Sequence, residues 1–301
     1  MKTDSTAITN RTIRVGAPTT ALGAARAAVA IEAMARAGLR ARHVGIAADP
    51  SGLGDEAIGE ATALEAALLD DSIDAAVTAL DGAAADPSSG LRISATLRRW
   101  SPLRALISHN RAPLSRLPAA SVVAADGDEV AAQVVSSRAD LVVTRGAGGP
   151  EDLIRRVREG DLDAAIVSFA DLAWLGRVDE ADQIVSVSEV APPAGAGALG
   201  LLIRSDDLEA AAILARVDHP LTAQAVLAER VFAEAVRDAT GFAVAASAAV
   251  HSGVVLFGRA VPRDGAERID VEERAVDPRR AAEAAARAIA FRAGRRRLAV
   301  A

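Results

Sequence analysis

The sequence predicts an α/β protein with two doubly wound sheets and a smaller α+β domain at its C-terminal end. Three observations indicate this class. Short apolar runs alternate with helical segments over about two hundred residues, which is typical of parallel sheets covered by helices. The alternation starts a second time near Ser121. It ends near His219-Pro220, where one helix precedes three consecutive strand-like runs.

The first series consists of strands and helices separated by turn residues. In chain order we expect a strand at 12–16, a helix at 21–37, a strand at 42–47, a helix at 60–69, a strand at 73–77 and strands at 91–97 and 103–108. Gly38 closes the first helix, because glycine adopts the left-handed conformation found after helix ends. Trp100-Ser101-Pro102 lies between the last two strands, where we expect the chain to cross between domains.

The second series repeats this alternation. We expect strands at 121–123, 140–144, 162–168, 184–187 and 200–204, and helices ending near 137, at 150–159, at 169–175 and ending at 215. Asp126 or Asp128 is expected to cap the first of these helices, since a carboxylate there accepts hydrogen bonds from the first turn. Pro150 is expected to begin the next helix.

The last part of the chain is expected to form the α+β domain. It comprises a helix at 221–238, strands at 242–250, 254–261 and 267–274, a turn at 262–265 and a final helix at 278–293. Asp277 followed by Pro278 is a favourable start for that last helix.

Composition excludes several classes of function. The net charge of −6 argues against a nucleic-acid-binding surface. No apolar stretch reaches the ~18 residues of a membrane span, and the first dozen residues carry no secretory signal. The sequence contains no cysteine, and its four histidines are scattered, so we expect no disulfide, iron–sulfur cluster or metal site. We expect a cytoplasmic protein without nucleic-acid or membrane partners.

The run at 73–77 is followed by small polar residues. Thr78, Asp81 and Gly82 come directly after it. Ligand sites of open α/β sheets lie outside the carboxyl ends of the strands. Thr78 is therefore a candidate ligand contact, and Asp81 is a weak catalytic candidate, although an aspartate beside a glycine is also a common turn former.

Eight stretches together resemble one enzyme family. They are residues 13–16 with 21–22, 64–69, 74–77, 117–123, 163–167, 170–172 with 175–176, 194–200, and 221–223 with 228–230. This order of segments resembles the hydroxymethylbilane synthases, also called porphobilinogen deaminases, of heme and porphyrin biosynthesis. The resemblance implies two periplasmic-binding-protein-like lobes and a third domain. The expected domains are residues 1–99 with 196–216, residues 100–195, and residues 217–301.

The resemblance also implies a reaction. The family condenses four porphobilinogen molecules into a linear tetrapyrrole on a dipyrromethane cofactor, which is bound covalently to a cysteine. Here Thr240-Gly241-Phe242 corresponds to the family's Gly-Gly-Cys loop, so Phe242 occupies the attachment position. A thioether requires a thiolate, which phenylalanine does not provide. We therefore expect no covalently attached cofactor.

Other family residues are also replaced. The segment 78–82 corresponds to His-Ser-Met-Lys-Asp, which places Gly82 at the catalytic carboxylate. The segment 17–20 lacks the family's arginine but keeps Thr19 and Thr20 as candidate ligand contacts. The segment 126–130 places acidic residues where the family has arginines, and such a reversal opposes carboxylate ligands.

One anion-binding pattern remains at the glycine-rich turn after the strand 140–144. Arg145, Gly146, Gly148 and Gly149 could present a guanidinium and backbone N–H groups to a carboxylate or phosphate. Ordinary turn geometry is the alternative interpretation. It is favoured by acidic residues in the first turn of the following helix, which complement the helix dipole.

Three hypotheses follow from the sequence. The first is a catalytically inactive family member that acts in tetrapyrrole metabolism. The second is an active deaminase with a noncovalent primer or one anchored without cysteine. The third is a binding protein for a small anionic ligand in the interlobe cleft, with Arg145 as a contact. The sequence identifies no protein partner and no oligomeric state.

Overall fold

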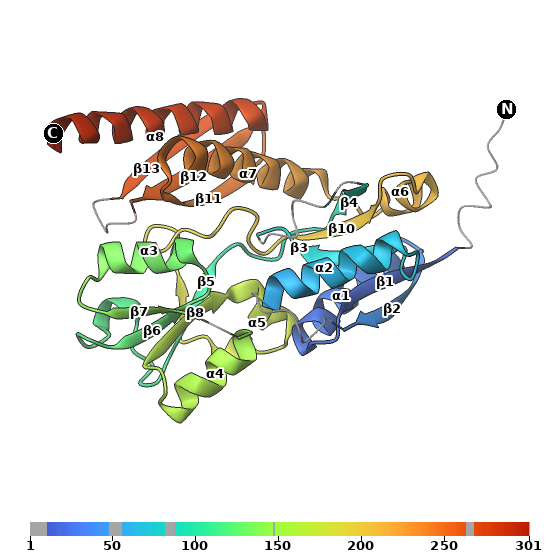
Figure 1. Ribbon diagram of the computed structural model, residues 1–301, viewed down its shortest axis with the longest axis horizontal. Helices are drawn as coiled ribbons and strands as arrows, with labels where there is room; N and C mark the ends of the chain where they lie inside the picture. Colours follow the sequence, from blue (N-terminus) through green and yellow to red (C-terminus); the bar gives the residue numbers. More distant parts are fainter. Residues whose placement is uncertain are drawn as a thin grey trace. The chain divides into compact units, whose positions relative to one another are not determined.

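The computed structural model describes residues 11–47, 56–81, 88, 90–146, 148–262 and 268–300. Figure 1 shows three sheets with helices packed against them. The chain divides into two compact units. The first contains Met1–Arg99 and Ala198–Ala223, and the second contains Trp100–Gly197 and the chain from Gln224 onward. The three-domain division expected from the sequence stays a prediction.

The first unit contains a five-stranded sheet. Its strands, in spatial order, are β2 (Arg40–Ile46), β1 (Thr12–Pro18), β3 (Ala75–Ala79), β10 (Leu199–Arg204) and β4 (Leu91–Thr96). The first three strands are parallel, and β10 runs antiparallel to both of its neighbours. Its helices are α1 (Ala21–Arg36), α2 (Glu56–Leu69) and α6 (Leu208–Leu214). The sheet therefore includes a strand that comes after the whole second sheet in sequence.

Alternating burial explains how β1 and α1 pack together. Ile13, Val15 and Ala17 are fully buried, as are Ala27 and Met34 on the helix. This spacing matches the two-residue period of a strand and the helical period of α1. The expected helix end is confirmed, since Gly38 follows α1 with a φ of +70°.

The second unit contains a sheet with the same arrangement. Its order is β7 (Val142–Arg145), β6 (Val122–Ala125), β8 (Ala164–Ser168), β5 (Arg104–Ser108) and β9 (Gln183–Val185). β5 is again the antiparallel fourth strand. Both sheets are therefore mixed rather than purely parallel. In each sheet the antiparallel fourth strand, β10 or β5, lies between the parallel strands and an edge strand.

Helices α3 (Asp128–Ser137), α4 (Pro150–Glu159) and α5 (Phe169–Trp174) accompany this second sheet. The predicted carboxylate cap of α3 is wrong. Gly127 occupies the N-cap position with a φ of 127°, and no side chain caps the helix there. Asp128 is the first helical residue, and Asp126 forms an ion pair with Arg104 instead. Glycine is used because this φ is strained for any residue with a side chain.

The end of the chain forms the expected α+β arrangement. Strands β11 (Ala243–Val250), β12 (Val254–Val261) and β13 (Ile269–Ala275) form an antiparallel sheet. Helices α7 (Pro220–Thr240) and α8 (Pro278–Val300) accompany it (Figure 1). Asp277 caps α8 by accepting a hydrogen bond from the backbone N–H of Arg280 at 2.9 Å. α8 extends beyond the expected end at 293, and the predicted turn at 262–265 lies largely outside the described residues.

Packing between α7 and β12 explains one glycine in this sheet. Phe232 of α7 is fully buried, and a Cβ atom at Gly258 would lie 2.3 Å from its Cζ atom. Only a glycine at this strand position leaves room for the ring.

No helix in the described part of the chain is long and apolar enough to cross a membrane.

Candidate functional site

Four of the predicted site residues lie at the carboxyl edge of the first sheet. Thr19 and Thr20 directly follow β1, while Thr78 lies near the end of β3 and Asp81 just after it. The pairing of Thr78 with Gly200 of β10 places the returning strand at the same edge. The structure therefore brings these residues to the edge where an α/β sheet holds its ligands.

The hydroxyl groups at this edge differ in accessibility, since Thr19 and Thr20 are exposed and Thr78 is buried. The Thr20 Oγ1 accepts a hydrogen bond from the backbone N–H of Gly23 at 3.1 Å, which caps α1. Thr78 is only 6% exposed, and Asp81 is half-buried. Gly82, the position of the family's catalytic carboxylate, lies outside the described residues. The described part of this edge thus contributes one carboxylate and no cationic group among the predicted candidates.

The remaining predicted ligand contacts lie at the carboxyl edge of the second sheet. Arg145 ends β7, and its Nη2 lies 2.6 Å from the Asp128 Oδ1 at the start of α3. Both side chains are more than half exposed. The Gly146 N–H donates to the carbonyl of Ala125 at 2.8 Å. The predicted anion contact is therefore paired with a carboxylate on the neighbouring connection.

The glycine-rich turn leads directly into α4. Gly148 has a φ of +89°, and Gly149 is the N-cap of the helix. No side-chain cap is found at Gly149 or at Gly127, which begins α3. The strands before these two helices are neighbours, since Ala125 of β6 pairs with Arg145 of β7. Two helix N-termini at one edge of a sheet attract an anion, but the acidic residues in their first turns already complement both helix dipoles: Asp128, Glu129, Glu151 and Asp152.

A buried arginine at this edge was missed in the sequence. Arg104 begins β5 opposite Ser168 and is 2% exposed. It forms an ion pair with Asp126, and its Nη2 also donates to the Asp126 carbonyl at 3.4 Å. An arginine inside the otherwise apolar run 103–107 is the signal that could have identified it. Its carboxylate partner reduces the charge that this arginine offers to a ligand.

Phe242 lies at the start of the C-terminal sheet. Its side chain is partly buried and packs against the hydrophobic core formed by α7, α8 and the three strands. Its backbone N–H donates to the Thr240 Oγ1 at 3.1 Å, which fixes the turn between α7 and β11. The residue at the predicted attachment position is thus an apolar packing residue.

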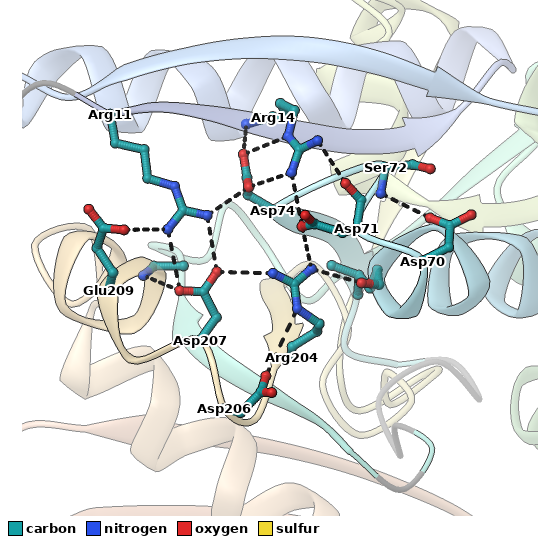
Figure 2. Close-up of polar contacts among 12 residues, drawn as sticks. Arg11, Arg14, Asp70, Asp71, Ser72, Asp74, Arg204, Asp206, Asp207 and Glu209 are labelled. Atoms are coloured by element: carbon teal, nitrogen blue, oxygen red, sulfur yellow. Dashed lines mark hydrogen bonds and ion pairs between the residues drawn. The ribbon is translucent and has the colours of Figure 1, made fainter.

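Another charged cluster occupies the opposite edge of the first sheet. Figure 2 shows the guanidinium groups of Arg11 and Arg14 on either side of Asp74. The Arg11 Nη2 lies 2.7 Å from the Asp74 Oδ1, and the Arg14 Nη2 lies 2.9 Å from it. Arg11 also pairs with Asp207 at 3.1 Å. This cluster was not predicted from the sequence, because its members come from three distant segments.

The cluster borders an open cavity of about 520 Å³. Its lining residues are Arg11, Thr12, Arg14, Asp71, Asp74, Arg204, Asp206 and Asp207. Burial by itself would raise the pKa of Asp74, but hydrogen bonds from Arg14 and Arg11 hold that pKa well below its ordinary value. Burial likewise opposes the ionisation of Asp207, but hydrogen bonds from the Ala210 N–H and from Arg11 lower its pKa.

This cavity is better explained as structure than as a ligand site. Each of the three arginines that line it forms an ion pair with at least one aspartate. It also lies at the amino ends of β1 and β3, away from the edge where α/β sheets hold ligands. These ion pairs join three segments of the first unit, at residues 11–14, 71–74 and 204–207. Among the residues described, no cluster of histidine, aspartate and glutamate is arranged to hold a metal ion.

Two mixed sheets of equivalent strand order, followed by an antiparallel sheet with two helices, define a three-sheet α/β protein with ligand candidates at its strand ends. Residues 13–212 match the family described as "Porphobilinogen deaminase, dipyromethane cofactor binding domain". The chain belongs to the porphobilinogen deaminase family.

Curated relatives agree with this assignment. The porphobilinogen deaminase of Pelotomaculum thermopropionicum is 33% identical over 169 residues, which cover 56% of this chain and 54% of the relative. That of Desulforudis audaxviator is 32% identical over 211 residues, covering 70% of this chain and 68% of the relative. The matches thus span between about half and two thirds of the relatives' length.

Solved structures of low sequence identity are also similar. A periplasmic substrate-binding protein of an ABC transporter from Coxiella burnetii is 16% identical, with a TM-score of 0.44. The similarity covers 70% of this chain and 94% of that protein.

Proposed function

We propose that this chain is a non-catalytic member of the porphobilinogen deaminase family that acts in tetrapyrrole metabolism by binding rather than by condensation. One observation carries the proposal: the 301-residue sequence contains no cysteine. The cofactor named in the family description does not fit this chain through a thioether, because no thiolate is present to form one. Phe242, at the predicted attachment position, packs against the C-terminal core.

The charge pattern at the second sheet supports the same proposal. A growing chain of pyrroles carries many carboxylates, and its recognition requires cations that are not already neutralised. Arg104 and Arg145 each lie beside an aspartate, at Asp126 and Asp128. Both acidic partners belong to the segment that corresponds to an arginine-rich segment of the family.

The decisive experiment measures the intact mass of the purified protein before and after incubation with porphobilinogen. The porphobilinogen deaminase of Desulforudis audaxviator serves as the positive control. We expect an unchanged mass and no linear tetrapyrrole in the reaction mixture. A covalent adduct on a single peptide, or steady tetrapyrrole production without an adduct, would overturn the proposal. The first result would reveal an anchor other than cysteine, and the second a noncovalent primer.

A second candidate function is the binding of a small anion at the carboxyl edge of the second sheet. The specific observation is the pair of helix N-termini at Gly127 and Gly149, neither of which has a side-chain cap. Backbone N–H groups at such ends bind carboxylates and phosphates. Such binding would take place at the carboxyl edge of the sheet, where α/β proteins hold their ligands, and would need no covalent attachment at Phe242.

Thermal unfolding in the presence of candidate ligands tests this second function. A ligand that binds only the folded protein raises the melting temperature, and the increase grows with the ratio of its concentration to its Kd. Porphobilinogen, a simple dicarboxylate and inorganic phosphate are the probes. The variant Arg145→Gln is expected to reduce the shift, whereas Arg158→Gln, which removes an exposed arginine from the last turn of α4, is expected to preserve it. Equal shifts in both variants, or none in the parent, would argue against this site.

A further inference from the structure

A buried arginine in the C-terminal sheet contacts a different part of the second unit. Arg259 of β12 is fully buried. Its Nε and Nη2 each lie 2.7 Å from an oxygen of the Asp270 carboxylate on β13, which is a two-point ion pair. The guanidinium also donates hydrogen bonds to residues outside the C-terminal sheet. Nη1 donates to the Gln133 Oε1 at 3.1 Å, and Gln133 belongs to α3 beside the second five-stranded sheet.

The same guanidinium also holds the segment that connects β9 to β10. We call residues 186–197 the return segment, since they lead the chain back to the first unit's sheet. Arg259 Nη2 donates to the carbonyl of Ser188 at 3.1 Å, and Nη1 donates to that of Glu189 at 3.2 Å. One buried cation therefore contacts three parts of the chain that are far apart in sequence.

Gln133 completes the connection from the other side. It is 1% exposed, and its amide bonds both backbone groups of Ala191: the Ala191 N–H donates to Oε1 at 2.7 Å, and Nε2 donates to the Ala191 carbonyl at 2.9 Å. The side chain thus holds the return segment on α3 while it accepts from Arg259. Buried polar groups that satisfy one another in this way depend on every member of the network.

Two further contacts hold the return segment on the C-terminal sheet. Glu229 of α7 is fully buried and accepts hydrogen bonds from the N–H groups of Gly195 at 2.8 Å and Ala248 at 2.6 Å. The Ala246 N–H donates to the carbonyl of Pro192 at 3.0 Å. The return segment is therefore bound at several points to the C-terminal sheet, and at its centre to α3.

We propose that Arg259 is a latch that couples the C-terminal sheet to the second five-stranded sheet through the return segment. While Arg259 makes these contacts, α3, the return segment and β12 undergo local unfolding together. Loss of the guanidinium removes the hydrogen bonds to the Ser188 and Glu189 carbonyls and to the Asp270 carboxylate, and the loss of these bonds favours opening. The return segment then exchanges and unfolds independently of the rest of the unit.

Hydrogen exchange of the full-length protein tests the latch. In Arg259→Met we expect amides of the return segment and of α3 to exchange about tenfold faster or more, since local opening controls their protection. Amides of α4, which contributes no residue to the network, serve as an internal reference. The matched control is Arg274→Met on β13, whose side chain is 75% exposed beside Glu272. It should leave protection as in the parent protein.

A second variant keeps the test valid if Arg259→Met fails to fold. Gln133→Leu removes the connection from the α3 side and leaves the C-terminal sheet's own ion pair intact. It should also raise exchange in the return segment, and the double variant should add less than the sum of the two single effects. The proposal is overturned if exchange rises only within β12 and β13, or if the two substitutions act additively.

Discussion

The backbone and the guanidinium of Arg14 both donate to the carboxylate of Asp74. The Arg14 N–H lies 2.7 Å from Oδ2, its Nε lies 3.1 Å from the same oxygen, and its Nη2 lies 2.9 Å from Oδ1. In return, the Asp74 N–H donates to the Arg14 carbonyl at 2.9 Å. These four hydrogen bonds align β1 with the start of β3, and Figure 2 shows Arg11 joining them from the other side.

Replacing Asp74 by asparagine should therefore destabilise the first unit. The Asp74 side chain is only 4% exposed, and its loss of charge leaves Arg11 and Arg14 without their shared anionic partner. We expect the free energy of unfolding to fall by about 2–4 kcal/mol in urea titrations.

Asp71→Asn is the control for that substitution. Asp71 pairs with Arg14 and Arg204, but its side chain is 65% exposed. An exposed pair contributes only about 0–1 kcal/mol, so this variant should stay close to the parent. Equal losses in the two variants would contradict the assignment of stability to the buried carboxylate.

The lowered pKa of Asp74 predicts how stability depends on pH. Burial opposes the ionisation of this carboxyl, but hydrogen bonds from the two arginines place its folded-state pKa below the ordinary value of 3.8. The ionised form therefore stabilises the folded state above the unfolded pKa, and this contribution is lost as the pH falls through the folded pKa. Urea midpoints measured at decreasing pH below about 5 should decline. They should decline less in Asp74→Asn, and parallel curves for parent and variant would disprove the linkage.

Two glycines should respond in opposite directions to alanine. A Cβ at Gly258 would lie 2.3 Å from Phe232, so Gly258→Ala should cost about 1–3 kcal/mol through overpacking. A Cβ at Gly294 of α8 would meet no heavy atom within 4 Å, so Gly294→Ala should gain about 0.5–1 kcal/mol from helix propensity. Thermal unfolding of both variants checks the two signs, and a loss of stability in Gly294→Ala would contradict the open surroundings of that position.

Restoring a thiol at the predicted attachment position should not restore the reaction. Phe242→Cys supplies a nucleophile, but the acidic partners of Arg104 and Arg145 remain in place. We expect no pyrrole adduct in the intact mass after incubation with porphobilinogen. Phe242→Ser controls for loss of the ring without a thiol. An adduct in the cysteine variant alone would show that the missing thiol is the principal barrier to catalysis.

Most elements of the fold could be predicted from residue patterns. The alternation of short apolar runs with helices locates the helix at Pro150–Glu159 and the three C-terminal strands. Local chemistry also identifies helix ends, as at Asp277 and Gly38. It fails at Gly127, where a glycine with positive φ replaces the expected carboxylate cap. Nearby aspartates are weak evidence for a cap when a buried arginine competes for them, as Arg104 does for Asp126.

The site could be predicted less well than the fold. The sequence places Thr78 and Arg145 near strand ends, and the structure confirms that position for both. It does not reveal what each side chain contacts, because the Arg145–Asp128 and Arg104–Asp126 pairs join residues from separate connections. The cluster around Asp74 could not be predicted for the same reason. It forms because β10 is inserted between β3 and β4, which brings residues 204–207 close to Arg11 and Asp71.

That insertion has a consequence for protein synthesis. The strands of the second five-stranded sheet lie between Arg104 and Val185, so all of them leave the ribosome before β10 does. The first sheet cannot be completed until Leu199–Arg204 is synthesised, because β10 is the strand that pairs with both β3 and β4. The second five-stranded sheet can therefore be completed before the first. Until then one edge of β3 lacks its partner β10, and unpaired strand edges are in general prone to aggregation.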